Sequence, residues 1–239
     1  MKVDGSVVIV TGASSGIGAA TARAASAAGA RVVLAARRVD RIRDLAGELG
    51  GAIAVQCDVT NQAQVTALAQ AALDAFGRID VLVNNAGQGL QSEVEQISLD
   101  DFRGILELNL VAPLAMMQAV LPSMRQQGVG SIVNVSSGTT FADAPGTGGY
   151  VASKIALERL SAIARAELEG TGVTVSTMIP FATDTEFLNS IRAGRAAAEA
   201  MTAGAVFDTP EQVADAILSL VSSGAPQMDL VPASYDGSR

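Results

Sequence analysis

The chain has 239 residues, a length that one doubly wound α/β domain can reach, and nearly half of them are apolar. Its formal net charge of −8 argues against nucleic acid or an anionic membrane as the main partner. The sequence contains no histidine, which excludes a Ser-His-Asp hydrolase and a histidine-based zinc site. We therefore predict no metal, and we expect any general acid or base to be Tyr, Lys, Asp, Glu or Cys.

The amino-terminal sequence and the cysteine content indicate where the protein works. We find no apolar run near the roughly 18 residues that cross a bilayer, and the first residues lack the features of a signal peptide. The single cysteine, Cys57, cannot form an intramolecular disulfide. These observations predict a cytoplasmic protein with no membrane partner.

Short β-branched runs alternate with longer Ala-rich stretches along the chain. The predicted strands are Val7–Val10, Arg31–Leu34, Ala52–Gln56, Val81–Val83, Ser131–Val135, Val173–Met178 and, more weakly, Met228–Val231. The predicted helices between them are Ala19–Ala28, Asp40–Leu49, Gln62–Phe76, Leu99–Arg125, Tyr150–Glu169 and Glu211–Val221. This alternation predicts a doubly wound, seven-stranded parallel Rossmann-type sheet with helices on both faces, in one α/β domain over 1–239.

One long segment, 181–207, does not fit the alternation. It is Ala-rich, is interrupted by Gly194 and Gly204, and mixes arginine with apolar residues. Long connections inside compact domains are usually functional or disordered. We predict a mobile lid over the substrate.

The first predicted strand runs into a glycine-rich loop that precedes a helix. Glycines let the backbone approach a pyrophosphate, and the helix N-terminus supplies free N–H groups. The alternative is an ordinary strand–helix turn, because a single glycine-rich loop is a weak signal. The strand before it and the helix after it favour a cofactor-binding loop, with Gly12, Ser14, Ser15, Gly16, Ile17 and Gly18 as the binding residues.

The end of the second predicted strand distinguishes the two nicotinamide cofactors. NAD enzymes usually carry an Asp or Glu there for the adenosine ribose. This chain carries Arg37 and Arg38 instead, and guanidinium groups pair well with a phosphate. The alternative is two solvated arginines at a helix start, but the location favours NADP(H).

Polar residues also follow the third and fourth predicted strands, at the sheet edge where open α/β proteins bind ligands. Asp58 is placed to accept a hydrogen bond from an adenine amino group, or else to cap the next helix. The cofactor-binding residues predicted in these two loops are Asp58, Val59, Asn85, Ala86 and Gly87.

Tyr150 and Lys154 lie four residues apart at the start of a predicted helix and so share one face. A nearby ammonium group favours the phenolate, so we expect the pKa of Tyr150 to be lowered from about 10. Tyr150 would then act as general acid in reduction and as general base in oxidation. Ser137, at the end of the fifth strand, is placed to polarise a substrate carbonyl.

Taken together, these motifs resemble the short-chain dehydrogenase/reductase family over nearly the whole chain. The matching segments are TGASSGIG at 11–18, Asp58-Val59, NNAG at 84–87, Asn109, NVSS at 134–137 and YVASK at 150–154. The resemblance implies a Ser-Tyr-Lys triad of Ser137, Tyr150 and Lys154, with Ser137 rather than Ser136 chosen by its spacing. It also implies that Asn109 holds a water behind Lys154, and that Tyr150 and Lys154 contact the cofactor.

The sequence departs from the family after the sixth strand. Members usually carry Pro-Gly there, whereas Pro180 is followed here by Phe181, which cannot easily take the backbone angles of glycine. The resemblance still places Pro180, Thr183 and Thr185 at the cofactor. Ala-Arg-Arg at 36–38, Thr-Asp-Thr-Glu at 183–186 and the C-terminal end resemble the NADP-dependent 3-hydroxy-acid and serine dehydrogenase branch.

These observations predict an oxidoreductase that transfers hydride between NADP(H) and a small carbonyl or alcohol. The alternatives are a ketoacyl-carrier-protein-type reductase and a catalytically silent NADP-binding module. For an acidic substrate, Arg192 and Arg195 are the candidate cations, although we favour solvated helix charges as their role. By resemblance we also expect a homodimer or homotetramer formed through the helices near 100–125 and 150–170.

Overall fold

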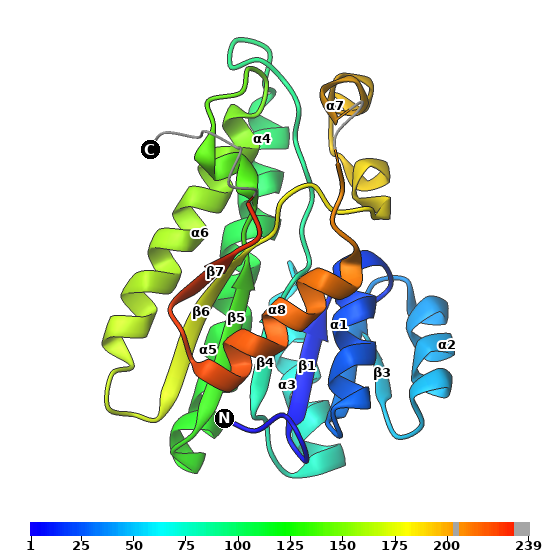
Figure 1. The fold of residues 1–239 in the computed structure, drawn as a ribbon, viewed down its shortest axis with the longest axis vertical. Helices are drawn as coiled ribbons and strands as arrows, with labels where there is room; N and C mark the ends of the chain where they lie inside the picture. The colour runs from blue at the N-terminus through cyan, green and yellow to red at the C-terminus, as the bar shows by residue number, and fades with distance from the viewer. Residues whose placement is uncertain (203–205, 232–239) are drawn as a thin grey trace.

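Seven parallel strands form one sheet in the order β3-β2-β1-β4-β5-β6-β7 in the computed structural model, which describes residues 1–202 and 206–231. The strands are β1 (Val7–Thr11), β2 (Arg31–Ala36), β3 (Ile53–Gln56), β4 (Val81–Asn84), β5 (Gly130–Val135), β6 (Val173–Ile179) and β7 (Gln227–Asp229). This confirms the predicted Rossmann-type fold (Figure 1). The last strand begins and ends slightly before the predicted Met228–Val231.

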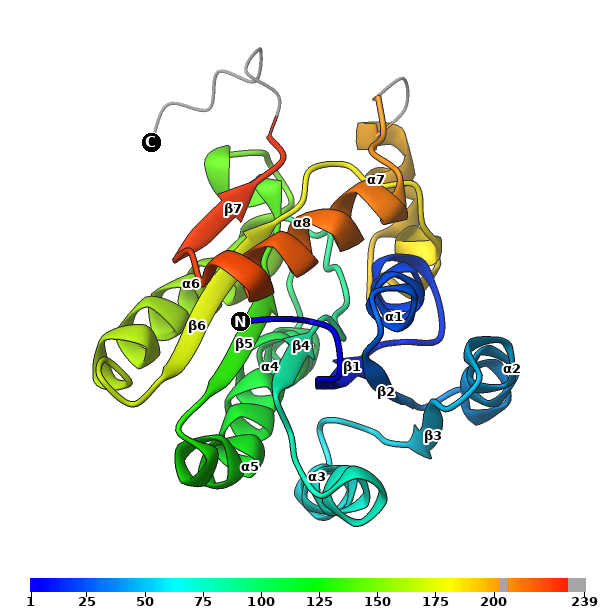
Figure 2. The ribbon, with the colours of Figure 1, turned by 60° about the horizontal axis from the view of Figure 1, so that its bottom comes forward.

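Helices cover both faces of the sheet, as Figure 2 shows. The six that connect or flank the strands are α1 (Gly16–Ala27), α2 (Val39–Leu49), α3 (Gln62–Phe76), α5 (Ala112–Gln127), α6 (Gly148–Glu167) and α8 (Pro210–Ser223). Residues of α1, α2 and α8 pack on one face, and those of α3, α5 and α6 pack on the other. Because helices cover both faces of the sheet, the strands carry apolar side chains on both faces.

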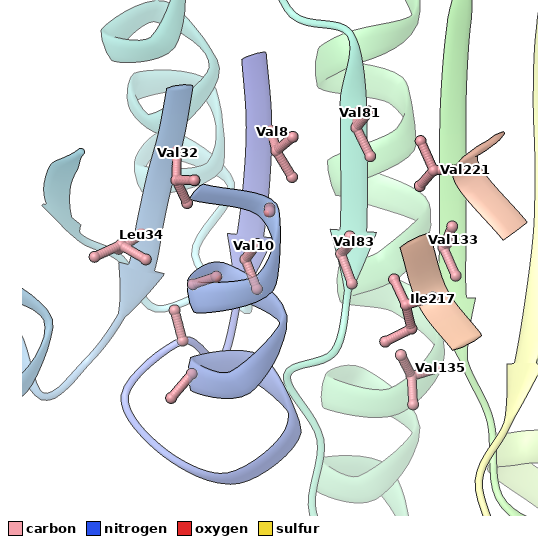
Figure 3. Packing of buried hydrophobic residues seen from close by; sticks show 14 of the residues in the cluster. Val8, Val10, Val32, Leu34, Val81, Val83, Val133, Val135, Ile217 and Val221 are labelled. Carbon is pink, nitrogen blue, oxygen red and sulfur yellow. The ribbon is translucent and has the colours of Figure 1, made fainter. Parts of the chain in front are cut away.

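Alternate residues of each strand supply the two cores. Val8 and Val10 of β1 point to the face covered by α1 and α8, where Ile217 of α8 also packs (Figure 3). Val7 and Ile9 point to the opposite face. Because successive side chains of a strand point to opposite faces, β1 contributes to the cores on both sides of the sheet.

From β1 the chain builds the sheet outward through β2 and β3, and it then returns to place β4 on the other side of β1. β1 pairs with β2 on one side and with β4 on the other. A crevice opens at the carboxyl ends of strands at such a point, and ligands bind there in open α/β sheets. The loops that follow β1 and β4 therefore face each other at this edge.

The stretch predicted as one helix over Leu99–Arg125 is interrupted. α4 (Leu99–Leu106) passes into a π-helical turn, η1 (Glu107–Val111), before α5 begins. Hydrophobic periodicity does not reveal the extra residue of a π turn, which often marks a functional site. The turn contains the buried Asn109.

The same stretch corrects the expectation that no segment could cross a bilayer. By length and composition alone, Leu99–Gln127 is long and apolar enough to do so. Its residues Met116, Val120 and Met124 are fully buried against the sheet. We therefore assign it as a core helix of this domain.

The segment 181–207, predicted as a mobile lid, is partly regular, and its mobility stays a prediction. It contains the 3₁₀ helix η3 (Glu186–Ser190) and α7 (Arg195–Thr202), while residues 203–205 lie outside the described range. A bridge between Thr183 and Asp208 ties its two ends together. We call residues 181–202 the lid segment from here on; Figure 1 shows it, yellow to orange, passing over the end of the molecule above α1.

Candidate active site

The loop between β1 and α1 leaves space only for glycine at key positions. Gly12 has φ +68°, and a β-carbon at Gly18 would lie 2.5 Å from the carbonyl oxygen of Gly12. The same β-carbon would lie 2.6 Å from Nδ2 of Asn85, closer than real contacts allow. The loop therefore presents its own backbone to a ligand, as a pyrophosphate requires.

Residues after β4 hold this loop in place. Nδ2 of Asn85 donates a hydrogen bond to the carbonyl oxygen of Thr11 at 3.0 Å. The Thr11 hydroxyl accepts hydrogen bonds from the backbone N–H groups of Asn85 and Ala86 at 3.0 and 3.1 Å. The NNAG motif therefore acts on the cofactor loop as well as lining the crevice.

The loop opens into a cavity of about 630 Å³ whose donors fit a dinucleotide. Ser15, the N-cap of α1, makes no side-chain cap, so the first N–H groups of the helix remain available to an anion. Most of the predicted cofactor-binding residues line the cavity: Gly12, Ser14, Ser15, Gly16, Ile17, Arg37, Arg38, Asp58, Val59, Asn85, Ala86, Gly87 and Thr185. Gly18 does not line the cavity; it packs closely against the backbone of Gly12 and the side chain of Asn85, and so supports the loop.

Three arginines, Arg37, Arg38 and Arg41, lie near the end of β2 and interact with different partners. Arg38 donates hydrogen bonds to the hydroxyls of Ser14 and Ser15, with Nη2 at 2.8 and 2.6 Å. Arg41, which we did not predict as a site residue, lies beside Arg38 and shares the Glu186 carboxylate with it. Arg37 is near Asp58 and contributes to the low pKa of that carboxyl.

Asp58 is held by its own turn. Its Oδ1 accepts hydrogen bonds from the backbone N–H and the hydroxyl of Thr60 at 3.0 and 2.7 Å. Although burial raises it, these bonds and the charge of Arg37 hold the pKa of Asp58 below its usual value. The cap of α3 is Asn61, whose side chain accepts from the N–H of Gln64, so Asp58 does not serve as the cap.

A second cavity, of about 560 Å³, adjoins the first at Asn85, Gly87 and Thr185. Its wall brings together five further predicted residues, namely Ser137, Tyr150, Lys154, Pro180 and Thr183, whereas Asn109 lines neither cavity. Ser137 lies directly after β5, and Tyr150 and Lys154 lie one turn apart on α6. The fold thus places the predicted triad beside the predicted cofactor loop.

The pKa of Tyr150 differs from the prediction. Burial raises it to about 12, and a hydrogen bond with Ser137 offsets only part of this increase. Nζ of Lys154 lies 5.9 Å from the centre of the Tyr150 ring and donates to the carbonyl oxygen of Val135 at 2.9 Å. The prediction of a lowered pKa was wrong because desolvation of the phenol outweighs the distant ammonium group.

Burial also acts on Lys154. It lowers the pKa of Lys154 to about 8, although the charge of Glu158 one turn further along α6 opposes this change. Glu158 accepts hydrogen bonds from the hydroxyls of Ser136 and Thr140 at 2.7 and 2.8 Å. Ser136 is thus turned to Glu158, which supports the choice of Ser137 as the serine that faces Tyr150.

Asn109 in the π turn lies near the ammonium group. Its side chain exchanges hydrogen bonds with the backbone of Gln88, and its Nδ2 donates to Ser153 at 3.1 Å. A β-carbon at Gly87 would lie 3.2 Å from Oδ1 of Asn109 and 3.5 Å from Nζ of Lys154. Asn109 and Lys154 therefore approach the same point, although the water at Asn109 stays a prediction.

The lid segment covers the catalytic end. The ring of Phe187 lies 5.9 Å from that of Tyr150, centre to centre. Phe181 causes no backbone strain, because every described residue with positive φ is a glycine. Its ring packs on Gly138, where a β-carbon would lie 2.9 Å from Phe181. The replacement of the family's glycine therefore adds an apolar wall to the cavity.

The two candidate cations for an acidic substrate are already paired. Arg192 donates to Asp101 at 3.0 Å, and Arg195 donates to Glu199 at 2.7 Å. Within the described part of the chain, the charged residues that line the second cavity are Lys154 and Asp184.

Comparisons with known proteins agree with this geometry. Residues 6–196 match the family model for short chain dehydrogenases. The chain is also similar to D-threitol dehydrogenase from Mycolicibacterium smegmatis, with 35% identity over 99% of this chain and 93% of that protein.

Solved structures share the fold over nearly the whole chain. A short chain dehydrogenase/reductase from Burkholderia phymatum in complex with NAD has a TM-score of 0.90 and 28% identity, and the match covers 98% of this chain and 91% of that one. The closed form of serine dehydrogenase complexed with NADP⁺ has a TM-score of 0.89 and 29% identity, with 98% of both chains covered.

Proposed function

Because the chain belongs to the short chain dehydrogenase family of oxidoreductases, we propose that it transfers hydride between NADP(H) and a small, uncharged carbonyl or alcohol. One observation carries the proposal: Ser137, Tyr150 and Lys154 share a cavity that adjoins the glycine-rich loop. A family member that kept only the cofactor-binding function would not need these three side chains together.

The side chains suit a reduction as follows. A bound reduced nicotinamide supplies the hydride, which is the chemistry that this chain's own groups lack. The Ser137 and Tyr150 hydroxyls donate hydrogen bonds to the substrate oxygen, and Tyr150 transfers its proton to that oxygen. Burial raises the pKa of Tyr150 to about 12, so Tyr150 is protonated at neutral pH, and its phenolate must be stabilised for the proton to be transferred. Lys154 holds positive charge near the phenol and helps to stabilise the phenolate that remains.

The arginines favour NADP(H) over NAD(H). Arg37 and Arg38, not a carboxylate, directly follow β2, and Arg41 adds a second guanidinium beside Arg38. Guanidinium groups bind phosphate oxygens through paired hydrogen bonds. The 2′-phosphate of NADP(H) therefore has two candidate partners at the mouth of the first cavity.

The second cavity favours a neutral substrate over the acidic substrates of the resembled branch. Much of its wall is apolar, including Phe181 and Phe187. The arginines of the lid segment do not line it: Arg192 lines the first cavity and pairs with Asp101, and Arg195 pairs with Glu199. A substrate carboxylate would lose its hydration there without a dedicated partner, which is costly.

The predicted homo-oligomer also stays part of the proposal. Val111, Ile155 and Ile163 lie on the helices expected to form the interface and are 43, 48 and 44% exposed. Their exposure supports a partner surface on η1 and α6.

The cofactor assignment is tested by comparing Arg38→Ala with Arg43→Ala in titrations with NADPH and NADH. Arg38→Ala should weaken NADPH binding by about tenfold or more, because it removes a phosphate partner, and should change NADH binding little. Arg43→Ala removes the same charge from an exposed residue of α2 that pairs with Asp40, away from the cofactor-binding residues, and should change neither. Equal affinity of the wild-type protein for both cofactors would contradict the NADP(H) assignment.

A further inference from the structure

Glu186 of the lid segment occupies the space between the two arginines at the end of β2. Its Oε2 accepts hydrogen bonds from Nη1 of Arg38 at 3.0 Å and from Nη1 of Arg41 at 2.7 Å. These contacts join residues that are 148 and 145 positions apart in the sequence. A carboxylate of the chain thus sits where two guanidinium groups converge.

The neighbouring residue lies against the cofactor loop. A β-carbon at Gly16 would lie 2.9 Å from Cγ2 of Thr185, so Thr185 packs directly on the loop that precedes α1. Thr185 also caps η3, accepting a hydrogen bond from the N–H of Phe187, whose ring packs beside that of Tyr150. One short stretch of the lid segment therefore touches the arginines, the glycine loop and the catalytic tyrosine.

We propose that Glu186 is an internal counter-anion that competes with the cofactor 2′-phosphate for Arg38 and Arg41, so that Glu186 helps to set the preference between NADPH and NADH. The inference rests on the proposed use of NADP(H). NADPH brings its own phosphate and releases Glu186 from the arginines. NADH carries no such group, so Glu186 stays paired when NADH binds.

The ion pairs of Glu186 with Arg38 and Arg41 are weak enough for a phosphate to displace the carboxylate. The side chains of Arg38, Arg41 and Glu186 are each nearly half exposed, so solvent screens the two ion pairs. Exposed pairs of this kind change an equilibrium constant by about fivefold or less each. A phosphate with close to two negative charges and three acceptor oxygens is the stronger partner for two guanidinium groups. Glu186 thus lowers NADPH affinity without preventing binding.

The release of Glu186 also connects cofactor binding to the lid segment. Glu186 begins η3, and Phe187 follows it directly in the sequence. When the carboxylate leaves the arginines, the stretch that carries Phe187 loses one of its contacts with the cofactor side of the crevice.

The test uses Glu186→Gln, which keeps the size of the side chain and removes its charge. The full-length wild-type protein and the variant are titrated with NADPH and with NADH, and Kd is measured by nicotinamide fluorescence. The variant should bind NADPH about three- to tenfold more tightly, with a smaller change for NADH, so that its preference for NADPH increases. Glu199→Gln is the matched control, because it removes the same charge from the lid segment but pairs with Arg195 inside α7.

Other outcomes separate this inference from the proposed function. If the wild-type protein prefers NADPH but Glu186→Gln binds it equally or less tightly, Glu186 does not compete with the phosphate and the inference is wrong. An equal gain for both cofactors would show only a general effect of charge, and would also overturn it. If the wild-type protein shows no preference for NADPH, the proposed cofactor is wrong and the inference fails with it.

Discussion

Tyr150→Phe should reduce turnover by about 10³-fold or more while leaving NADPH binding nearly unchanged, since a positioned general acid contributes about 10²–10⁴-fold. The substitution removes the hydroxyl that faces Ser137 and keeps the ring that packs against Phe187. No histidine is available to replace it. The measurement is kcat with a responsive ketone, together with Kd for NADPH.

Turnover and NADPH affinity, measured on the same variant, separate a loss of proton transfer from a loss of folding or cofactor binding. A loss of turnover with Kd for NADPH within about twofold of the wild-type value assigns the loss to proton transfer. Activity close to that of the wild-type protein would show that another group supplies the proton, and the proposed role of Tyr150 would be wrong.

Lys154→Met should have two opposite effects: a loss of activity of about 10²-fold or more, and a gain in stability. Burial lowers the pKa of Lys154 to about 8, so the folded protein binds this proton less tightly than the unfolded chain does. A difference of this size corresponds to about 3 kcal/mol of lost stability at neutral pH. Methionine removes that cost, but it leaves the carbonyl of Val135 without its Lys154 donor, so the expected net gain is about 1–3 kcal/mol.

The sign of this effect can be checked through its pH dependence. Between pH 8 and about 10.5 the unfolded chain binds more protons at Lys154 than the folded protein, so the Lys154 contribution increases the wild-type free energy of unfolding with pH. Lys154→Met should lose this increase, while Lys2→Met, at an exposed lysine, should keep it. Denaturant unfolding at several pH values measures both, and a variant less stable than the wild-type protein at pH 7 would contradict the account.

The fold could be predicted from the sequence because its signals are local. Apolar β-branched runs such as Val7–Val10 mark strands buried on both faces, and the glycines after β1 mark the turn that a phosphate loop needs. Right-handed crossovers between parallel strands then lead to a Rossmann-type sheet, whereas the order of its strands comes from the structure. The π turn at Asn109 was missed because one extra residue in a helical turn leaves the apolar pattern almost unchanged.

The electrostatics of the site could not be predicted in the same way. The shared face of Tyr150 and Lys154 follows from their spacing, but their burial depends on β5, the lid segment and the loops around them. Desolvation therefore reversed the expected direction of the Tyr150 pKa. Arg41 and Glu186 were also missed, because their ion pair joins segments 145 residues apart and no local pattern indicates it.

The most direct test of the proposed function is the oxidation of NADPH by the wild-type protein with matched neutral ketones and 3-oxo carboxylates. We expect neutral ketones to be reduced, with kcat/KM about tenfold or more above the values for the carboxylates, because the described cavity offers an acid no arginine. Faster reduction of the carboxylates would contradict the neutral-substrate assignment. Tight NADPH binding without oxidation by any ketone would contradict the enzymatic function itself and favour a cofactor-binding module.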